Sequence, residues 1–333
     1  MKIAFVSPSF PPDICGVGSY TAKLADSLEG EDVETSLLTA ENTSFNPLRI
    51  ARVYSRLKKQ RPDILHLQYP TQKRLSALEA LLLFKAAKML DIKTVITIHE
   101  HESFYSRKSQ LRNKLLAKSA NAVIVNSQRS YELFKLQGIE SDIIHNGPTI
   151  EPDNGKRSET NGTVLTFFGF IAQHKNTLAT IISIKRAYVD PDVSIRIVGN
   201  FNPSDSYHVL VKNQLGPKDD WLSGLNDAEV AKAIGGSTLA VLPFKHGVSE
   251  KNSTAISMFH LGVPVITNGP VPGALKGSVI DADADFGAKV SEVLHNKKQL
   301  LQIRDNATSL IEDDFNWKAC AARHVQLYGR LTS

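Results

Sequence analysis

The chain has 333 residues, of which 42% are hydrophobic and 22% charged, as expected for a globular protein long enough for two domains. No apolar run reaches the roughly 20 residues of a membrane-spanning helix, and the N-terminus is typical of a strand rather than of a signal peptide. Two cysteines, Cys15 and Cys320, are too few for a disulfide framework. We therefore expect a cytoplasmic protein.

Short β-rich runs alternate with amphipathic helical patterns along the whole chain, which predicts parallel sheets built from βαβ units. In the first half, the expected strands are 2–7, 33–39, 63–67, 93–98, 122–126 and 142–145, and the expected helices are 19–29, 47–60, 74–90, 107–118 and 127–137. In the second half, expected strands 163–168, 193–198, 238–242, 263–267 and 278–280 alternate with helices near 175–188, 205–214, 226–234, 253–261 and 283–295, and a last helical stretch runs over 299–331.

These patterns predict an α/β protein with two Rossmann-like, doubly wound domains facing a cleft. The N-terminal domain is expected at 1–150 and the C-terminal domain at 160–315, with 148–162 as a linker. Residues 316–333 are expected to form a C-terminal helix that packs back on the N-terminal domain. Because open parallel sheets bind ligands beyond the carboxyl ends of their strands, the loops that follow the strands are the candidate sites.

Two glycines, Gly16 and Gly18, stand between the first strand and its helix. Because free N–H groups and the helix dipole favour an anion, this loop predicts a phosphate near the helix N-terminus. A dinucleotide site is an alternative, although Thr21 occupies the third glycine position of that fingerprint. Glycines needed only for a turn are the other alternative.

Nine segments in order resemble the retaining glycosyltransferases of family 4, which have the GT-B architecture of two Rossmann-like domains. The segments are "PPDICGVGSYTAKLADSL", "DILHLQ", "VITIHE", "VIVNS", "IIHNG", "FFGFIAQHKN", "IRIVG", "WLSGLNDAEVAKAI" and "LPF" followed by "GVPVIT". The resemblance implies a transferase with a nucleotide-sugar donor in the C-terminal domain and an acceptor in the N-terminal domain.

The resemblance assigns roles to residues of the N-terminal half. Gly16 and Gly18 are expected against the donor diphosphate or beside the acceptor, and His99 next to the reacting sugar. Two alternatives for His99 stay open, a loop histidine without a site role and a metal ligand that shares one face with His101.

In the C-terminal half, "GFIAQHKN" matches the stretch whose Arg and Lys bind the diphosphate. Gly169 and Lys175 are in register, but Phe170 stands where the family has Arg. One of the two cations that would neutralise the leaving group is therefore missing, and His174 or Lys245 are the candidates to compensate. The alternative for Lys175 is a surface lysine at a helix start.

The family's Glu-x7-Glu motif is the largest departure, because Ser249 and Ser257 occupy its two positions. Glu250, one position out of register, is the candidate for the first Glu, which faces the donor sugar, and Ser257 is a weak partner for a ribose hydroxyl. The run "EKNST" opens a helix, and we expect Asn252, Ser253 and Thr254 to cradle a phosphate, with plain helix capping as the alternative.

The loop 199–225 is expected to bind the nucleobase, with Asn200, Trp221 and Leu222 as contacts and a core role for Trp221 as the alternative. A calcium-like spacing at Asp281, Asp283, Asp285 and Glu292 lacks the glycine that such a loop needs, so a helix start with acidic residues is the better interpretation. We therefore expect no metal.

The function predicted from the sequence is metal-independent transfer of a hexosyl or related sugar from a nucleotide sugar to an acceptor hydroxyl, with retention, in glycan biosynthesis. The nucleotide sugar is a co-substrate, and no cofactor is expected. The alternatives are a catalytically weak GT-B protein that binds a nucleotide sugar or a partner subunit, and a sugar-nucleotide epimerase.

Positive charge gathers in residues 49–118, which hold 16 basic and 5 acidic residues. The helix predicted at 107–118 interleaves Arg107, Lys108, Arg112, Lys114 and Lys118 with leucines. This pattern predicts peripheral contact with an anionic membrane and a glycan or lipid-linked acceptor, and a solvated helix with a soluble acceptor is the alternative. No nucleic-acid recognition module accompanies the charge.

Overall fold

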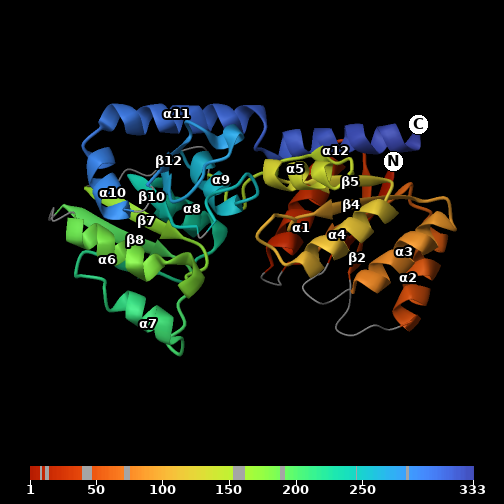
Figure 1. Ribbon diagram of the computed structural model, residues 1–333, viewed down its shortest axis with the longest axis horizontal. Helices are drawn as coiled ribbons and strands as arrows, with labels where there is room; N and C mark the ends of the chain where they lie inside the picture. The colour runs from red at the N-terminus through yellow and green to blue at the C-terminus, as the bar shows by residue number, and fades with distance from the viewer. Residues whose placement is uncertain are drawn as a thin grey trace. The chain divides into compact units, whose positions relative to one another are not determined.

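The chain forms two compact units in the computed structural model (Figure 1), one of residues 1–146 and 316–333 and the other of residues 147–315. Each unit is an α/β structure around one parallel sheet of six strands, which confirms the predicted fold class. The structure describes residues 1–7, 10–11, 15–39, 47–70, 76–152, 162–187, 192–244, 246–282 and 285–333.

The sheet of the first unit has the order β2-β1-β3-β4-β5-β6, with every pair parallel. Its strands alternate their buried side chains between two cores, because successive side chains of a strand point to opposite faces. In β1, Ile3 and Phe5 enter one core, and Ala4 and Val6 enter the other. The strands are β1 (Lys2–Ser7), β2 (Glu34–Thr39), β3 (Ile64–Tyr69), β4 (Lys93–Ile98), β5 (Ala122–Val125) and β6 (Asp142–Ile143).

Helices cover both faces of this sheet. The core that contains Ala4 and Val6 also takes side chains from α2 to α5, and the core that contains Phe5 takes them from α1 and α12. The helices are α1 (Gly16–Glu29), α2 (Pro47–Gln60), α3 (Ala77–Lys88), α4 (Arg107–Ser119), α5 (Gln128–Leu136) and α12 (Trp317–Thr332).

The C-terminal helix α12 follows the last residue of the second unit and belongs to the first, where it packs on α1. It begins at the N-cap Asn316, whose side chain accepts a hydrogen bond from Ala319 N at 2.7 Å. Its buried face carries the polar side chains of His324 and Tyr328 as well as apolar ones. Both polar side chains are fully buried, so each needs a hydrogen-bond partner inside the unit.

The sheet of the second unit has the order β12-β11-β10-β7-β8-β9, again wholly parallel. Its strands are β7 (Thr163–Phe168), β8 (Val193–Val198), β9 (Asp220–Leu222), β10 (Leu239–Leu242), β11 (Val265–Thr267) and β12 (Val279–Asp281). Its helices are α6 (Thr177–Ala187), α7 (Ser206–Lys212), α8 (Asp227–Gly235), α9 (Ser253–His260), α10 (Phe286–Leu294) and α11 (Lys297–Asp313), with short 3-10 turns η2 (Gln173–Lys175) and η3 (Gly273–Leu275). The sheet again separates two cores, one beneath α8 and α9 and the other beneath α6, α7 and α10.

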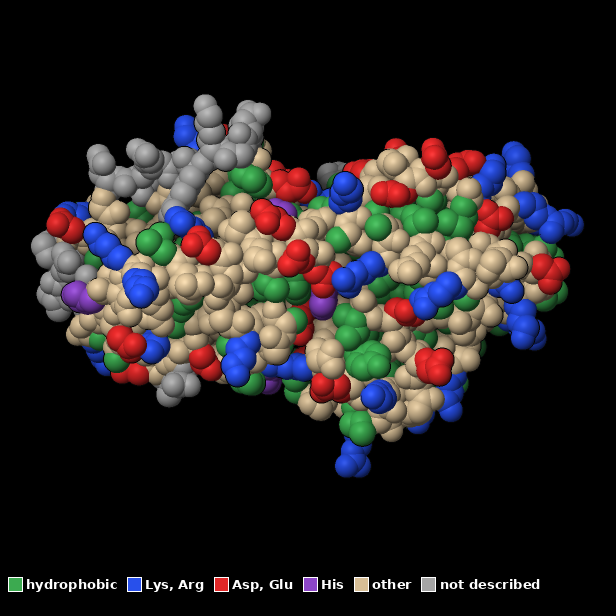
Figure 2. Space-filling model, turned by 90° about the horizontal axis from the view of Figure 1, so that it is seen from above, with side chains coloured by type: hydrophobic (Ala, Val, Ile, Leu, Met, Phe, Trp, Pro, Cys, Tyr) green, Lys and Arg blue, Asp and Glu red, His purple; other side chains and the backbone are tan. Residues whose placement is uncertain are grey.

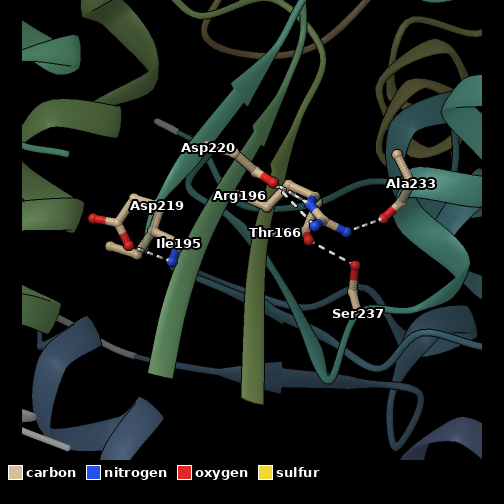
Figure 3. Close-up of polar contacts among 7 residues, drawn as sticks. All are labelled: Thr166, Ile195, Arg196, Asp219, Asp220, Ala233 and Ser237. Atoms are coloured by element: carbon tan, nitrogen blue, oxygen red, sulfur yellow. Dashed lines mark hydrogen bonds and ion pairs between the residues drawn. The ribbon is translucent and has the colours of Figure 1, made fainter. Parts of the chain in front are cut away.

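The strand β9 is attached to β8 by charged side chains as well as by its backbone (Figure 3). The Arg196 guanidinium donates to both carboxylate oxygens of Asp220, with distances of 3.0–3.1 Å, and to the carbonyl of Ala233 at 3.0 Å. The carboxylate of Asp219 accepts from Ile195 N at 2.7 Å. Because a two-pronged Arg–carboxylate pair fixes direction as well as distance, this cluster sets the register of a strand only three residues long.

The features that differ from the sequence prediction include a strand, a helix break and part of the linker. The strand β9 was not predicted, because the apolar run at this position is only two residues long. The helical stretch predicted over 299–331 is two helices, and Phe315, buried between them, and the N-cap Asn316 mark the break. Thr149 and Ile150 fall in the predicted linker, but their N–H groups donate to Ser257 Oγ and Ile150 enters the core.

Within the described ranges, no helix is both long enough and apolar enough to cross a membrane. Basic and acidic side chains are mixed on the face of the molecule that Figure 2 shows.

The buried histidines of the first unit make its stability depend on pH. Burial lowers the pKa of His324 and of His101 to about 4. Between pH 6.5 and 4 the unfolded chain binds a proton at each of these histidines and the folded chain does not, so stability falls as the pH falls through this window. At about 1.4 kcal/mol per pKa unit, His324 alone accounts for about 3 kcal/mol.

Urea unfolding followed by tryptophan fluorescence checks this prediction, because the two units hold one tryptophan each. In a Trp221→Phe background, Trp317 reports the first unit. The free energy of unfolding should drop between pH 7 and pH 4.5, and His324→Gln should reduce the drop. His295→Gln, at an exposed position of the second unit, is the control, and a first unit equally stable at both pH values contradicts the prediction.

Candidate active site

The glycine loop of the first unit leads directly into a helix. Helix α1 begins at Gly16, three residues earlier than the sequence predicted, and its N-cap Cys15 offers no capping side chain. Gly18 is buried in the first turn, while a Cβ added to Gly16 would meet no atom of the described residues within 4 Å. As far as the described residues show, Gly16 leaves open space beside N–H groups that no side chain caps.

His99 follows β4 and lies beside α1. Its Nε2 is 2.9 Å from Gln68 Oε1, and its ring meets the edge of the Tyr20 ring with centroids 4.8 Å apart. Tyr20 lies in the second turn of α1, so the structure brings the predicted glycine helix and the predicted histidine together. The side chain of His99 is half-buried.

His101 does not share the surroundings of His99. Its ring is fully buried and stacks on Phe134 of α5 at 3.7 Å, in the core on the other side of the sheet from Tyr20. The proposed sharing of one face by these two histidines is therefore wrong. Within the described ranges, no three His, Cys, Asp or Glu side chains are grouped to hold a metal ion; Asp283 of the calcium-like spacing lies outside them.

In the second unit, three loops meet at the carboxyl edge of the sheet. Gly169 follows β7 with φ of +103°, and a Cβ there would lie 3.5 Å from Thr254 Oγ1 at the start of α9. Gly199 follows β8, and a Cβ on it would collide with the carbonyl oxygen of Gly169. The predicted residues Gly169 and Thr254 are thus neighbours, and glycine is required at both loop starts.

Lys175 ends the turn η2 on the same edge. It lines a small hollow with Phe168, Phe170 and Phe244, and burial lowers the pKa of its ammonium group. Among the described residues, this ammonium group has no hydrogen-bond or ion-pair partner. Desolvating an ammonium group without a counter-charge costs free energy in the ligand-free protein. An anionic ligand that binds there would offset this cost. Phe170 is 65% exposed, and Lys245 lies outside the described residues.

The helix α9 begins without a side-chain cap, although Asn252 is its N-cap. The Asn252 carboxamide oxygen instead accepts from Ser249 N at 2.6 Å and Ser249 Oγ at 3.1 Å. The helices α3, α4, α5, α7, α8, α10, α11 and α12 do carry side-chain caps, so α1 and α9 stand apart among helices whose N-cap is described. In α9, Ser253 N and Ala255 N donate to the carbonyls of Lys251 and Asn252, so among the described residues the first-turn N–H of Thr254 is the one available to an anion.

Two of the predicted contacts are buried inside the protein. Glu250 is fully buried just before α9. The Ser257 hydroxyl is also fully buried, lies 3.2 Å from Thr149 Oγ1, and accepts from Thr149 N and Ile150 N at 3.1 Å each. A ribose hydroxyl would have to compete with these contacts, so Ser257 holds the start of the second unit in the ligand-free chain.

The residues predicted to contact the base lie at the ends of β8 and β9. Asn200 is exposed, and Trp221 and Leu222 are half-buried in β9. The Trp221 indole donates to the carbonyl of Gly199 at 2.9 Å, and its ring meets that of Phe201 edge-on at 4.9 Å. This hydrogen bond holds the loop that carries Asn200.

A histidine that belongs to no sequence motif connects two of these loops. His208 of α7 accepts from Asn202 N at 2.9 Å and donates to the carbonyl of Ile171 at 2.8 Å. It thereby fastens the loop after β8 to the loop that carries Lys175. A lone histidine in a short amphipathic helix carries no motif, so only the fold reveals this contact.

Comparison with known proteins agrees with this architecture. Residues 14–151 match the model of the family described as Glycosyltransferase Family 4. No curated protein matches the chain.

Solved structures with a similar fold cover nearly the whole chain. The apo form of the lipopolysaccharide outer core galactosyltransferase WaaB has a TM-score of 0.64 and 14% identity, over 99% of this chain and 100% of that chain. UDP-GlcNAc 2-epimerase from Neisseria meningitidis, bound to UDP-GlcNAc, has a TM-score of 0.64 and 11% identity, over 99% and 100%. The S. aureus MnaA–UDP co-structure has a TM-score of 0.64 and 12% identity, over 99% and 97%. At such identities the likeness shows the fold, so the chain has the GT-B fold, and its residues 14–151 carry the sequence pattern of Glycosyltransferase Family 4.

Proposed function

We propose that the chain is a retaining glycosyltransferase that moves a sugar from a nucleotide-sugar donor to an acceptor hydroxyl without a metal ion. The observation that carries the proposal is Lys175, a partly desolvated cation without a counter-charge among the described residues, at the sheet edge that also holds the uncapped start of α9. The family match of residues 14–151 and the fold support it. The solved structures similar to this chain include enzymes bound to UDP and to UDP-GlcNAc.

The second unit would stabilise the leaving diphosphate. As the bond between the sugar and the diphosphate breaks, negative charge develops on the phosphate oxygens. The N–H group of Thr254 at the start of α9 and the Lys175 ammonium would be in place before this charge develops, and such preorganised donors are commonly the largest contribution to catalysis. Ser253 and Thr254 are half-buried in the first turn of α9 and add hydroxyls to the same cradle.

The first unit would hold the acceptor and the sugar. The sugar passes through an oxocarbenium-like state, and the acceptor hydroxyl attacks from the face that the diphosphate leaves. We assign the binding of the sugar and the acceptor to His99 and to the open space beside Gly16. Glu250 remains the candidate for a contact to the donor sugar, which requires that its buried side chain become accessible when ligand binds.

A sugar-nucleotide epimerase is the second candidate, because several of the similar structures are UDP-GlcNAc 2-epimerases. A catalytically weak binding protein is the third, and the phenylalanine at position 170 and the engaged hydroxyl of Ser257 favour it. The family match of residues 14–151 favours the transferase over both. The three candidates differ in their products.

Mass spectrometry of products separates them. The purified chain is incubated with nucleotide sugars, with and without a mixture of glycan and lipid-linked acceptors, and with EDTA in parallel. We expect an acceptor heavier by one sugar and a free nucleoside diphosphate, with equal yield in EDTA because the proposed charge stabilisation uses only N–H groups and an ammonium group. A new sugar nucleotide formed without acceptor identifies an epimerase, no product with clear ligand binding identifies a silent protein, and a yield restored only by Mg²⁺ or Mn²⁺ contradicts metal independence.

Lys175 should contribute more to ligand binding and turnover than to the folding stability of the second unit. Lys175→Met removes a charge that burial disfavours, so the ligand-free second unit should be as stable as the wild type or more so. Loss of one charge-assisted contact should weaken inorganic pyrophosphate binding by about 10- to 100-fold, and turnover should fall by roughly 100-fold.

Calorimetric titration with pyrophosphate and urea unfolding followed by Trp221 measure the two effects. Lys232→Met, which removes an exposed charge from α8 of the same unit, is the matched control and should leave both values unchanged. Pyrophosphate affinity unchanged in Lys175→Met removes this residue from the proposed site.

The acceptor is proposed to come from an anionic membrane, and α4 carries the argument. Leu111 and Leu115 are 69% and 54% exposed. At about 100° per residue, these leucines lie at the centre of the exposed face, while the buried side chains of α4 lie on the opposite face. The basic side chains that flank the leucines are Arg107, Lys108, Arg112, Lys114 and Lys118. Apolar side chains between basic ones suit the headgroup boundary, where each basic residue contributes about 1 kcal/mol.

Vesicle sedimentation tests this surface. The chain should sediment with anionic phosphatidylglycerol vesicles at low salt, less at high salt, and not with phosphatidylcholine vesicles. Leu111→Ser with Leu115→Ser, and Lys108→Gln with Lys118→Gln, should each weaken binding at least tenfold. Lys297→Gln with Lys298→Gln removes as much charge from α11 of the other unit and is the control. No sedimentation at low salt refutes the membrane contact and leaves a soluble acceptor.

A further inference from the structure

Helix α7 packs beside α6 in the second unit (Figure 1) and contacts the chain on both sides of Lys175. Residues 171–178, which we call the lysine segment, run from the loop after β7 into the first turn of α6. Two consecutive side chains of α7, Tyr207 and His208, each form a hydrogen bond to the backbone of this segment. These contacts lie at its two ends, so the turn that carries Lys175 is held between them.

The His208 ring is bound by two backbone groups that permit only one tautomer. Asn202 N donates to Nδ1 at 2.9 Å, and a backbone N–H can only donate. The carbonyl of Ile171 lies 2.8 Å from Nε2 and can only accept, so Nε2 carries the proton. The carboxylate of Asp205 is 3.9 Å from Nε2, too far for a hydrogen bond. The neutral imidazole is therefore a fixed connection between the loop after β8 and the lysine segment.

The Tyr207 hydroxyl acts on α6 as a capping side chain does. Leu178 N lies in the first turn of this helix, where N–H groups have no partner within the helix. It donates to the Tyr207 oxygen at 3.0 Å. Tyr207 is itself held in place, because its own N–H donates to the Asp205 carboxylate at 2.8 Å and its ring packs against the core beneath α6. The tyrosine thus fixes the start of α6, which begins at Thr177, two residues after Lys175.

Between these two hydrogen bonds the lysine segment turns sharply. Asn176 has a φ of +54°, in the left-handed region that Asn adopts more readily than most other residues with a side chain. Just before this turn, Lys175 lines the hollow that it shares with Phe168 and Phe244. Because the turn lies between two fixed points, releasing either of them would let the lysine leave the hollow.

We propose that Tyr207 and His208 are positioning residues for Lys175: by holding the lysine segment at both ends, α7 keeps the ammonium group at the carboxyl edge of the sheet, where an anion meets it. The proposal deepens the proposed function and rests on it, because Lys175 is there the group that meets the diphosphate. A lysine side chain on a free loop turns its charged end to water. The two hydrogen bonds oppose this movement and so keep the cation partly desolvated before ligand binds.

Two isosteric substitutions separate the two hydrogen bonds of His208. An asparagine amide reaches the position of Nδ1 and can accept from Asn202 N, but it leaves the buried carbonyl of Ile171 without a donor. A glutamine amide reaches the position of Nε2 and can donate to Ile171. It leaves Asn202 N without its acceptor, but Asn202 is exposed, so water can replace that bond. Only His208→Asn should therefore release the lysine segment.

Calorimetric titration with inorganic pyrophosphate measures the effect on the site. His208→Asn should weaken pyrophosphate binding by about three- to tenfold, the worth of one net hydrogen bond, and His208→Gln should stay within about twofold of the wild type. Tyr207→Phe, which removes the acceptor of Leu178 N, should weaken binding as His208→Asn does. His295→Asn and His295→Gln, at an exposed position of the same unit, are the matched controls and should leave the affinity unchanged.

A measurement without ligand shows whether the variants act through Lys175. The pKa of this lysine is followed by the pH dependence of its Cε shift in ¹³C-lysine protein, and its signal is identified by its loss in Lys175→Met. Burial lowers this pKa in the wild type. His208→Asn and Tyr207→Phe should raise the pKa toward the ordinary lysine value of 10.5, because water then reaches the ammonium group, and His208→Gln should not.

The two measurements distinguish failure of the positioning role from failure of the proposed function. If the wild type binds no pyrophosphate while the Lys175 pKa changes as expected, the diphosphate site is refuted and the positioning role stands. A folded His208→Asn with wild-type pKa and affinity overturns the proposal. Equal losses in His208→Asn and His208→Gln also overturn it, because they show a general structural role of the ring. If His208→Asn does not fold, an unchanged Lys175 pKa in Tyr207→Phe overturns the proposal.

Discussion

Parallel pairing throughout each sheet is the constraint on which the other features depend. All strands of a parallel sheet end at the same edge, so every loop that follows a strand reaches that edge. In the second unit this constraint brings the loops at Gly169 and Gly199 and the start of α9 together, although they are distant in sequence. In the first unit it brings the Gly16 helix and His99 together. The chemistry of each unit therefore concentrates at one edge of its sheet.

The fold could be predicted from the sequence where periodicity is strong. Strands such as Thr163–Phe168 and Lys93–Ile98 are apolar runs buried on both faces, and their bounds agree with the prediction. The strand Asp220–Leu222 was missed because its place in the sheet depends on the ion pair between Arg196 and Asp220. These residues are 24 positions apart, so no local pattern shows the pair. The start of α1 was misplaced because Cys15 is not a capping residue, and a helix without a cap shows no start signal.

The positions of the motif residues in the candidate site could be predicted from the sequence, but the side chains that surround them could not. Gly16, His99, Gly169, Lys175 and Thr254 lie on the loops and helix starts where the motifs put them. The side chains that hold them, such as Gln68 and His208, are buried polar residues with no local pattern. Their partners are up to 37 residues away, and a single sequence does not reveal such pairs.

The short outer strands have a consequence for how the chain behaves at high concentration. On one side the first sheet ends at β6, a strand of two residues, and the second sheet ends at β9 and β12, each of three residues. A strand that short offers few unpaired N–H and C=O groups to another chain. The remaining edge is β2, with six residues from Glu34 to Thr39, and its first residue forms an exposed ion pair with Lys2. Among the described strands, aggregation by edge-to-edge pairing is thus opposed by strand length at three of the four sheet edges, and β2 is the one long edge strand.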